Sequence, residues 1–152
     1  MHVNSILVDW GQDLCAMCPR IYLKPKTKFM PRLDMEGAFP LTKEEIDRQI
    51  PEDVIGNYAF GNTVKDNAGN KAFCVRYVGR ADREPLRDRI KHGIKDGYSE
   101  FKFSIAKTKK EAYEKECKNW HDFGGLEGRL DNKIHPDKPD GTDYECPYCK
   151  GK

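Results

Sequence analysis

Two Cys-x-x-Cys pairs stand near opposite ends of the sequence, Cys15 with Cys18 and Cys146 with Cys149. Two such pairs commonly form a tetrahedral zinc site with four thiolate ligands, in which each pair supplies one edge. Because the ends of a domain often lie close together, both pairs can share one ion. The sequence therefore predicts a structural Zn²⁺ held by terminal zinc knuckles. Two unconnected reduced pairs, or a disulfide-prone pair in a flexible tail, are the alternatives.

The chain of 152 residues, 34% of them charged, has the length and polarity of one soluble domain. Its first residues lack the basic start and the apolar core of a secretory signal peptide. Its apolar runs stay far below the ~20 residues that a membrane-spanning helix needs. We therefore expect a cytoplasmic protein with no membrane partner, in a reducing compartment where six cysteines do not build a disulfide framework.

Two threonines are predicted to begin helices. Thr42 is followed three residues later by Glu45, and Thr108 by Glu111. This spacing is typical of a capping box, in which the two side chains satisfy backbone N–H groups of the first turn. The second of these helices is expected to run to about Phe123, before two glycines.

A β-hairpin is predicted in the middle of the chain. Residues 57–61 and 71–79 are strand-like, and the sequence between them has the composition of a turn. Simple alternation along the second strand puts Phe73, Val75 and Tyr77 on one face.

A helix after Pro85 and a strand at residues 101–105 complete the order helix, hairpin, helix, strand, helix, loop. This order predicts an α/β (α+β) fold with a small three-stranded, mainly antiparallel sheet flanked by helices. Residues 1–42 are predicted as an irregular segment with the first cysteine pair, 43–134 as the main domain, and 135–152 as a loop with the second pair.

Glu116 is the least expected charge in the predicted helices. Its neighbours at helical spacing include Ala112, Tyr113 and Trp120, so the carboxylate lies beside the apolar face. A carboxylate near a core costs free energy unless it is paired or binds a cation. We therefore expect a basic partner or a metal ion beside it, and a structural salt bridge is the simplest alternative.

Three further residues have weak signals of their own. Tyr58 and Tyr77 lie on the two arms of the hairpin, each with a glycine within three residues, and tyrosines in strands are usually core residues. Arg89 borders the buried stripe of its helix. None of these positions points to a function alone.

Together, these positions resemble the GIY-YIG nuclease superfamily. The resemblance covers roughly residues 43–134. It rests on the order and spacing of five elements: Gly56-Asn57-Tyr58, Tyr77-Val78-Gly79-Arg80-Ala81-Asp82, Leu86-Arg87-Asp88-Arg89-Ile90, Glu111-Ala112 leading to Glu116, and Asn132. Asn57 stands where the family usually has isoleucine or valine, and the spacing from Tyr77 to Arg89 is longer than usual.

The resemblance implies a catalytic set. Tyr58 and Tyr77 match the tyrosines of the two half-motifs, Arg89 the helix arginine, and Glu116 the metal-binding glutamate. Asn132 matches the late asparagine. His92 falls near a histidine that some members use, with an exposed helical histidine as the alternative.

The implied roles suit phosphodiester hydrolysis. Glu116 would hold a hydrated Mg²⁺ or Mn²⁺, and Arg89 would bind a phosphate oxygen with its planar fork. Tyr77 or Tyr58 would orient or deprotonate a water molecule, and deprotonation requires nearby cations that lower the phenol pKa. All four side chains are then expected within roughly 10 Å of one another, because one phosphate has to touch every group.

A basic cluster overlaps these motifs. Between Arg76 and Lys95 the sequence has seven basic and three acidic residues, although such clusters are usually solvated surface. The resemblance places it beside the site, as a positively charged surface for DNA. The residues predicted to contact DNA are Arg76, Arg80, Arg83, Arg87 and Lys91.

The leading hypothesis is a metal-dependent endonuclease acting on DNA, whether intact, branched or damaged. One alternative is a nucleic-acid-binding module that keeps the fold without turnover, for which Asn57 leaves room. The other is a zinc-stabilised interaction module. The chemically competent side chains at all five motif positions favour the endonuclease.

Overall fold

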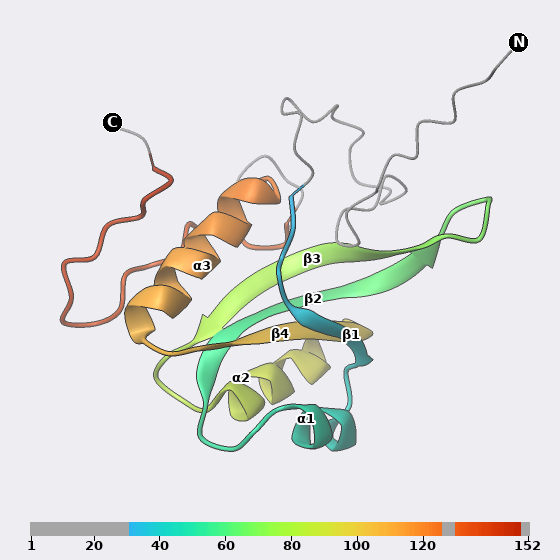
Figure 1. Cartoon of the computed structure of the whole chain (residues 1–152), viewed down its shortest axis with the longest axis horizontal. Coiled ribbons are helices and arrows are strands. Elements are labelled where there is room, and N and C mark those ends of the chain that lie inside the picture. Colours follow the sequence, from blue (N-terminus) through green and yellow to red (C-terminus); the bar gives the residue numbers. More distant parts are fainter. Residues whose placement is uncertain (1–30, 126–129, 150–152) are drawn as a thin grey trace, which may run out of the picture.

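The computed structural model describes residues 31–125 and 130–149, which form an α+β fold as predicted. Figure 1 shows the arrangement of the elements. In chain order they are β1 (Glu36–Pro40), α1 (Lys43–Gln49), β2 (Ile55–Lys65), β3 (Lys71–Ala81), α2 (Leu86–His92), the 3₁₀ turn η1 (Gly93–Asp96), β4 (Glu100–Ala106) and α3 (Lys109–Asp122).

The sheet has four strands among the described residues, in the order β1-β4-β2-β3, with every neighbouring pair antiparallel. The prediction of three strands is therefore wrong. The additional strand, β1, pairs with β4 and places Phe39 opposite Phe101. Its five residues contain a glycine and a proline and no clear alternation, so its strand character comes from this pairing and not from local propensity.

Both threonines cap their helices as predicted, but the reciprocal half of the first capping box does not form, because the Glu45 side chain bonds to Gln49 and the Thr42 N–H to the Pro40 carbonyl. The Thr42 hydroxyl accepts a hydrogen bond from the Glu45 backbone N–H at 3.2 Å, and that of Thr108 accepts one from Glu111 at 3.1 Å. The Glu111 carboxylate also reaches back to the backbone N–H of Lys107 at 2.8 Å. These bonds satisfy donors that the first helical turn leaves without partners, and they fix where α1 and α3 begin.

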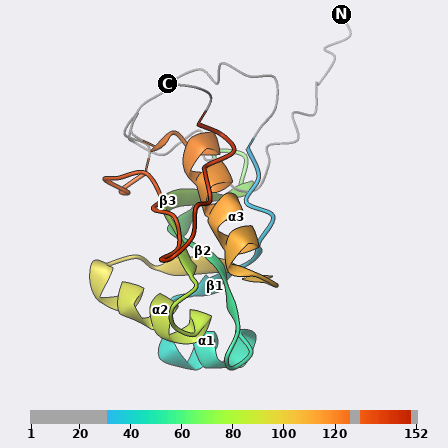
Figure 2. The same cartoon turned by 90° about the vertical axis from the view of Figure 1, so that its left-hand side faces the viewer.

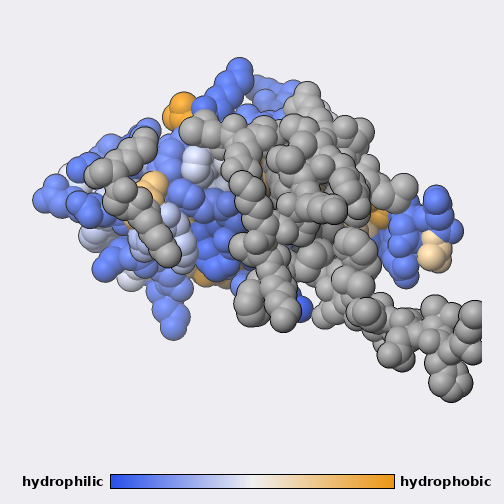
Figure 3. Space-filling view, turned by 90° about the horizontal axis from the view of Figure 1, so that it is seen from above, coloured by the Kyte–Doolittle hydropathy of each residue, from blue (hydrophilic) through white to orange (hydrophobic). Residues whose placement is uncertain are grey.

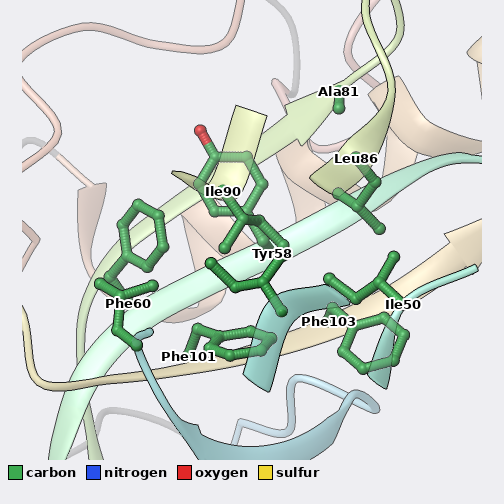
Figure 4. Packing of buried hydrophobic residues seen from close by; sticks show 10 residues of the cluster. Ile50, Tyr58, Phe60, Ala81, Leu86, Ile90, Phe101 and Phe103 are labelled. Atoms are coloured by element: carbon green, nitrogen blue, oxygen red, sulfur yellow. The ribbon is translucent and has the colours of Figure 1, made fainter. Parts of the chain in front are cut away.

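The helices cover both faces of the sheet (Figure 2). One face packs against α1 and α2, where Ile46, Ile50, Leu86 and Ile90 meet the aromatic residues Tyr58, Phe60, Phe101 and Phe103 (Figure 4). The other face packs against α3, where Trp120 and Phe123 meet Ala59, Phe73 and Val78. The fold thus has three layers with the sheet in the middle.

A β-bulge in β3 changes which face its side chains occupy. Phe60 pairs with Tyr77, but Gly61 pairs with Val75, so Arg76 is an extra residue. Phe73 and Val75 therefore belong to the α3 core, whereas Tyr77 packs with the α1/α2 core. The prediction that these three share a face is wrong, because one inserted residue inverts the alternation.

The segment 130–149 runs beside α3 and along the outer edge of β3 (Figures 1 and 2). The Asp131 backbone N–H donates to the Arg76 carbonyl at 2.6 Å. The Asn132 amide bonds to both backbone groups of Val78, at 3.0 and 2.8 Å, as a neighbouring strand would. This pairing covers the open edge of the sheet.

The described surface seen from above is mostly hydrophilic, with small separate hydrophobic areas (Figure 3). Exposed large hydrophobic residues in the described part of the chain are Ile105, Ile134 and Tyr148. None of the helices formed by residues 31–125 and 130–149 has the length and apolar character needed to cross a membrane.

Candidate active site and metal centre

A cleft of about 270 Å³ opens at the edge of β3. Four predicted catalytic residues line it: Tyr77 from β3, Arg89 from α2, Glu116 from α3 and Asn132 from the C-terminal segment. These residues come from separate parts of the chain. The sheet edge is where side chains from the two helical layers can meet.

Tyr58 lies immediately behind the cleft. Its hydroxyl accepts a hydrogen bond from Arg89 Nε at 3.3 Å, and its ring centroid is 6.2 Å from that of Tyr77. The side chain is almost fully buried in the α1/α2 core, with the hydroxyl oxygen at the edge of the cluster (Figure 4). Tyr58 is therefore placed to orient Arg89 and not to line the cleft.

Gly79 makes the position of Tyr58 possible. The two residues pair across the β2–β3 ladder. A Cβ atom at residue 79 would lie 2.4 Å from Tyr58 Cζ and 2.5 Å from its hydroxyl oxygen. The missing side chain therefore leaves the space through which the phenol reaches Arg89.

We expect Gly79→Ala to lower the free energy of unfolding by about 1–3 kcal/mol, the usual range for overpacking a core. The Tyr58 ring is held by Phe60 and cannot retreat freely. Chemical denaturation measures this loss. Gly69→Ala is the matched control for glycine substitution, since no atom lies within 4 Å of a Cβ there. Because Gly69 has a positive φ, we expect this control to lose a small amount of stability. Equal stability of Gly79→Ala and wild type would contradict the packing argument.

Glu116 has the basic partner that its position in α3 predicts. Its carboxylate forms an ion pair with Arg80, and both side chains are nearly buried. Burial raises the pKa of Glu116 to about 7, although Arg80 acts in the opposite direction. The protein alone thus compensates the charge of Glu116 incompletely.

Arg80 has several partners within the protein besides Glu116. It was predicted to contact DNA, but it also bonds to Asp82 at 2.8 Å and to the Asp137 carbonyl at 2.7 Å. These contacts occupy its guanidinium group inside the protein. The available signal was an arginine directly after the Tyr77-Val78-Gly79 motif, in a chain whose Glu116 needs a basic partner.

Burial also raises the pKa of both tyrosines. For Tyr58, desolvation outweighs the opposing effect of Arg89. For Tyr77, desolvation and the nearby Glu116 both raise the phenol pKa. Both phenols therefore keep their protons at neutral pH and are suited to donate hydrogen bonds.

The two remaining predicted residues differ in position. Asn132 lines the cleft, but its amide is occupied by the backbone of Val78. His92 lies largely exposed on α2, with its nearest charged contact at Glu84, 3.9 Å away, and it does not line the cleft.

The other predicted DNA contacts form ion pairs within the protein. Arg76 pairs with Asp131, Arg83 with Asp140, Arg87 with Glu52 and Lys91 with Asp47. Three arginines and four acidic residues line the cleft, so its lining has no excess of positive charge. Counting charges along residues 76–95 missed the acidic residues that folding brings from elsewhere.

A second cluster lies next to the cleft. The candidate ligand atoms of His121, His135, Cys146 and Cys149 all lie within 4.8 Å of one another. His121 Nε2 is 3.4 Å from each of the two sulfur atoms, and His135 Nε2 is 3.2 Å from Cys149 Sγ. This Cys₂His₂ cluster could hold a metal such as zinc.

The cluster changes the predicted zinc site. Cys146 and Cys149 take part, whereas Cys15 and Cys18 lie outside the described residues. Neither histidine was predicted from the sequence as a metal ligand. The available signal was distance along the chain: both histidines lie much nearer to Cys146 and Cys149 than the first cysteine pair does.

Comparison of the chain with protein-family models, with curated proteins and with solved structures found no match. A small α+β fold is by itself compatible with many activities. The functional argument therefore depends on the two sites described above.

Proposed function

We propose that this chain is a metal-dependent endonuclease of the GIY-YIG kind, which hydrolyses phosphodiester bonds of DNA. The observation that carries the proposal is the convergence of Tyr77, Arg89 and Glu116 in one cleft, with Tyr58 bonded to Arg89 behind it. A purely structural role for these residues gives no reason for them to meet at one open surface.

Glu116 fits the role of a ligand for Mg²⁺ or Mn²⁺. Arg80 takes one carboxylate oxygen, and among the described residues the other oxygen has no hydrogen-bond partner. Magnesium commonly uses one or two carboxylates and keeps several waters, for which the cleft has room. Because burial outweighs Arg80 in setting the pKa of Glu116, a cation would also relieve an under-compensated charge. A bound ion would neutralise developing phosphate charge and acidify a coordinated water.

Arg89 is suited to bind the scissile phosphate. Its Nε donates to Tyr58, and this bond sets the plane of the guanidinium group. Its Nη1 lies 3.4 Å from Glu84, on the partly exposed side of the residue. A planar guanidinium held from behind presents two donors to phosphate oxygens at a fixed angle.

Tyr77 is suited to orient the attacking water. Its ring lines the cleft, and its raised pKa keeps the hydroxyl protonated. A protonated phenol can hold a water or a phosphate oxygen by donating a hydrogen bond, but it is a poor general base. Of the roles considered for the tyrosines, orientation therefore has the better support.

Arg83 is the best candidate for a contact with the DNA backbone. Its side chain is 64% exposed, and its ion pair with Asp140 is also exposed. An exposed ion pair contributes only about 0–1 kcal/mol, so a phosphate can replace Asp140 at little cost. The acidic residues in the cleft make DNA binding there depend on a cation.

The proposal is tested by incubating the purified protein with plasmid DNA and with branched DNA. We expect cleavage with Mg²⁺ or Mn²⁺, none with excess EDTA, and recovery when Mg²⁺ is restored. Binding without cleavage under every metal condition would instead indicate a catalytically silent module. Neither binding nor cleavage would leave the zinc-stabilised interaction module as the better description.

A further inference from the structure

We propose that His121, His135, Cys146 and Cys149 bind one zinc ion, which fastens the C-terminal segment to the end of α3. His121 stands in the last turn of that helix, and the other three residues belong to segment 130–149. This donor set differs from the four-cysteine site predicted from the sequence. It also does not include Glu116, the carboxylate proposed to bind magnesium.

The distances between the ligand atoms match a tetrahedral site. Zinc bonds of about 2.3 Å to sulfur and 2.0–2.1 Å to nitrogen, at tetrahedral angles, place S and N ligands about 3.6 Å apart. The three S···N distances given above are 3.2–3.4 Å. A small expansion around one ion therefore converts this cluster into a four-coordinate centre.

Neighbouring groups hold the ligands in this orientation. His135 Nδ1 lies 2.8 Å from the Pro136 carbonyl, which can only accept, so the contact favours the tautomer that has its proton on Nδ1 and leaves Nε2 to bind a metal. Metal-bound histidines commonly use their second nitrogen in this way. The Trp120 ring packs edge-on against both histidine rings, at 5.0 and 4.8 Å.

The cysteine pair has the matching backbone turn. The Cys149 N–H donates to the Cys146 carbonyl at 3.3 Å. Two thiolates and two imidazoles are a soft to intermediate donor set, which suits zinc and not magnesium or calcium.

Asp131, Asn132 and Asp137 form hydrogen bonds with β3, but the segment buries little apolar surface. Residues 130–149 form no helix or strand, and their buried apolar side chains are Leu130, Pro136 and Pro139. Because metal-binding free energy becomes folding free energy, zinc would supply much of the order of this segment.

Zinc would thereby shape the cleft. His135 is both a ligand and a lining residue, and Asp137, two residues later, holds Arg80 through its carbonyl. Arg80 in turn pairs with Glu116. This effect of zinc on the cleft depends on the proposed function only if it is measured as nuclease activity.

The site is tested on the full chain by elemental analysis and cobalt substitution. We expect about one zinc per chain, and a Co²⁺ spectrum of a tetrahedral site with two thiolates. His121→Gln, His135→Gln and Cys149→Ser should each lower zinc affinity at least about tenfold. His92→Gln is the matched histidine control, and the double variant Cys15→Ser/Cys18→Ser tests the four-cysteine site; both should keep their zinc.

Zinc retained by both histidine variants, zinc lost from the Cys15/Cys18 variant, or a spectrum of four thiolates would overturn the proposal. The spectrum is recorded on the wild-type sequence, so it decides the question even if a variant fails to fold. Hydrogen exchange gives a further readout, since zinc removal should speed exchange in residues 130–149 and leave α1 unchanged. These measurements need no nuclease activity, so a failed cleavage assay leaves the zinc proposal separately decidable.

Discussion

Glu116→Gln is expected to lower DNA cleavage by about 100-fold or more while the protein folds normally. The amide keeps the volume of the side chain but loses the charge that would hold the metal ion. Arg80 keeps Asp82 and the Asp137 carbonyl as partners, so it is not left unpaired. Initial cleavage rates at saturating Mg²⁺ measure the effect.

Glu114→Gln is the matched control, because Glu114 is a more exposed residue of the same helix, 3.9 Å from Lys110. It should cleave at the wild-type rate. Equal loss in the two variants, or full activity in Glu116→Gln, would contradict the assignment of Glu116.

Without metal, the wild type and Glu116→Gln should also differ in stability, and the difference should depend on pH. Burial raises the pKa of Glu116 from 4.5 to about 7, so the folded state holds this proton where the unfolded state releases it. The wild type therefore loses stability relative to Glu116→Gln as the pH rises through this interval. Thermal unfolding should show a gap in favour of the variant that grows from pH 5 to pH 8.

The parts of the fold that the sequence predicted are those determined by local chemistry. Thr42 and Thr108 begin helices because their hydroxyls satisfy donors only three residues away. The hairpin turn forms for the same reason, since the Asp66 carboxylate accepts from Ala68 and Asn70 at 2.8 and 2.9 Å. Such interactions need no knowledge of the rest of the chain.

The parts of the fold that could not be predicted from the sequence depend on contacts between distant residues. Strand β1 exists through its pairing with β4, and the bulge at Arg76 depends on the register between β2 and β3. The bulge matters for the site, because it turns Tyr77 to the face that carries Tyr58. A residue-by-residue alternation contains no sign of such an insertion.

The candidate site was likewise predicted only in part from the sequence. Matching motif positions identified the residues around Arg89 and Glu116, because the order of elements fixes where they converge. The partners of these residues were not identified. Arg80 was predicted to contact DNA, and its bond to Glu116 was not foreseen. His121 was not recognised as a ligand, because its relation to Cys146 and Cys149 appears only when α3 and the C-terminal segment lie side by side.

Arg89→Lys is expected to lower cleavage by about 100-fold with little change in thermal stability. Lysine keeps the positive charge but is a single point donor, whereas Arg89 donates to Tyr58 through Nε and has two further nitrogens for a phosphate, one of which, Nη1, would exchange Glu84 for it. The lost bidentate contact is made most strongly in the transition state, so kcat should fall more than KM rises.

Arg48→Lys is the control for this substitution, since Arg48 is an exposed residue of α1 that pairs with Glu45. It should retain wild-type kinetics. Tyr58→Phe should produce a smaller loss than Arg89→Lys, because it removes the group that orients the guanidinium and leaves the phosphate contact itself. If Arg89→Lys stayed within about threefold of the wild-type kcat, a point charge would suffice, and the orienting bond that Arg89 donates to Tyr58 would have no catalytic role.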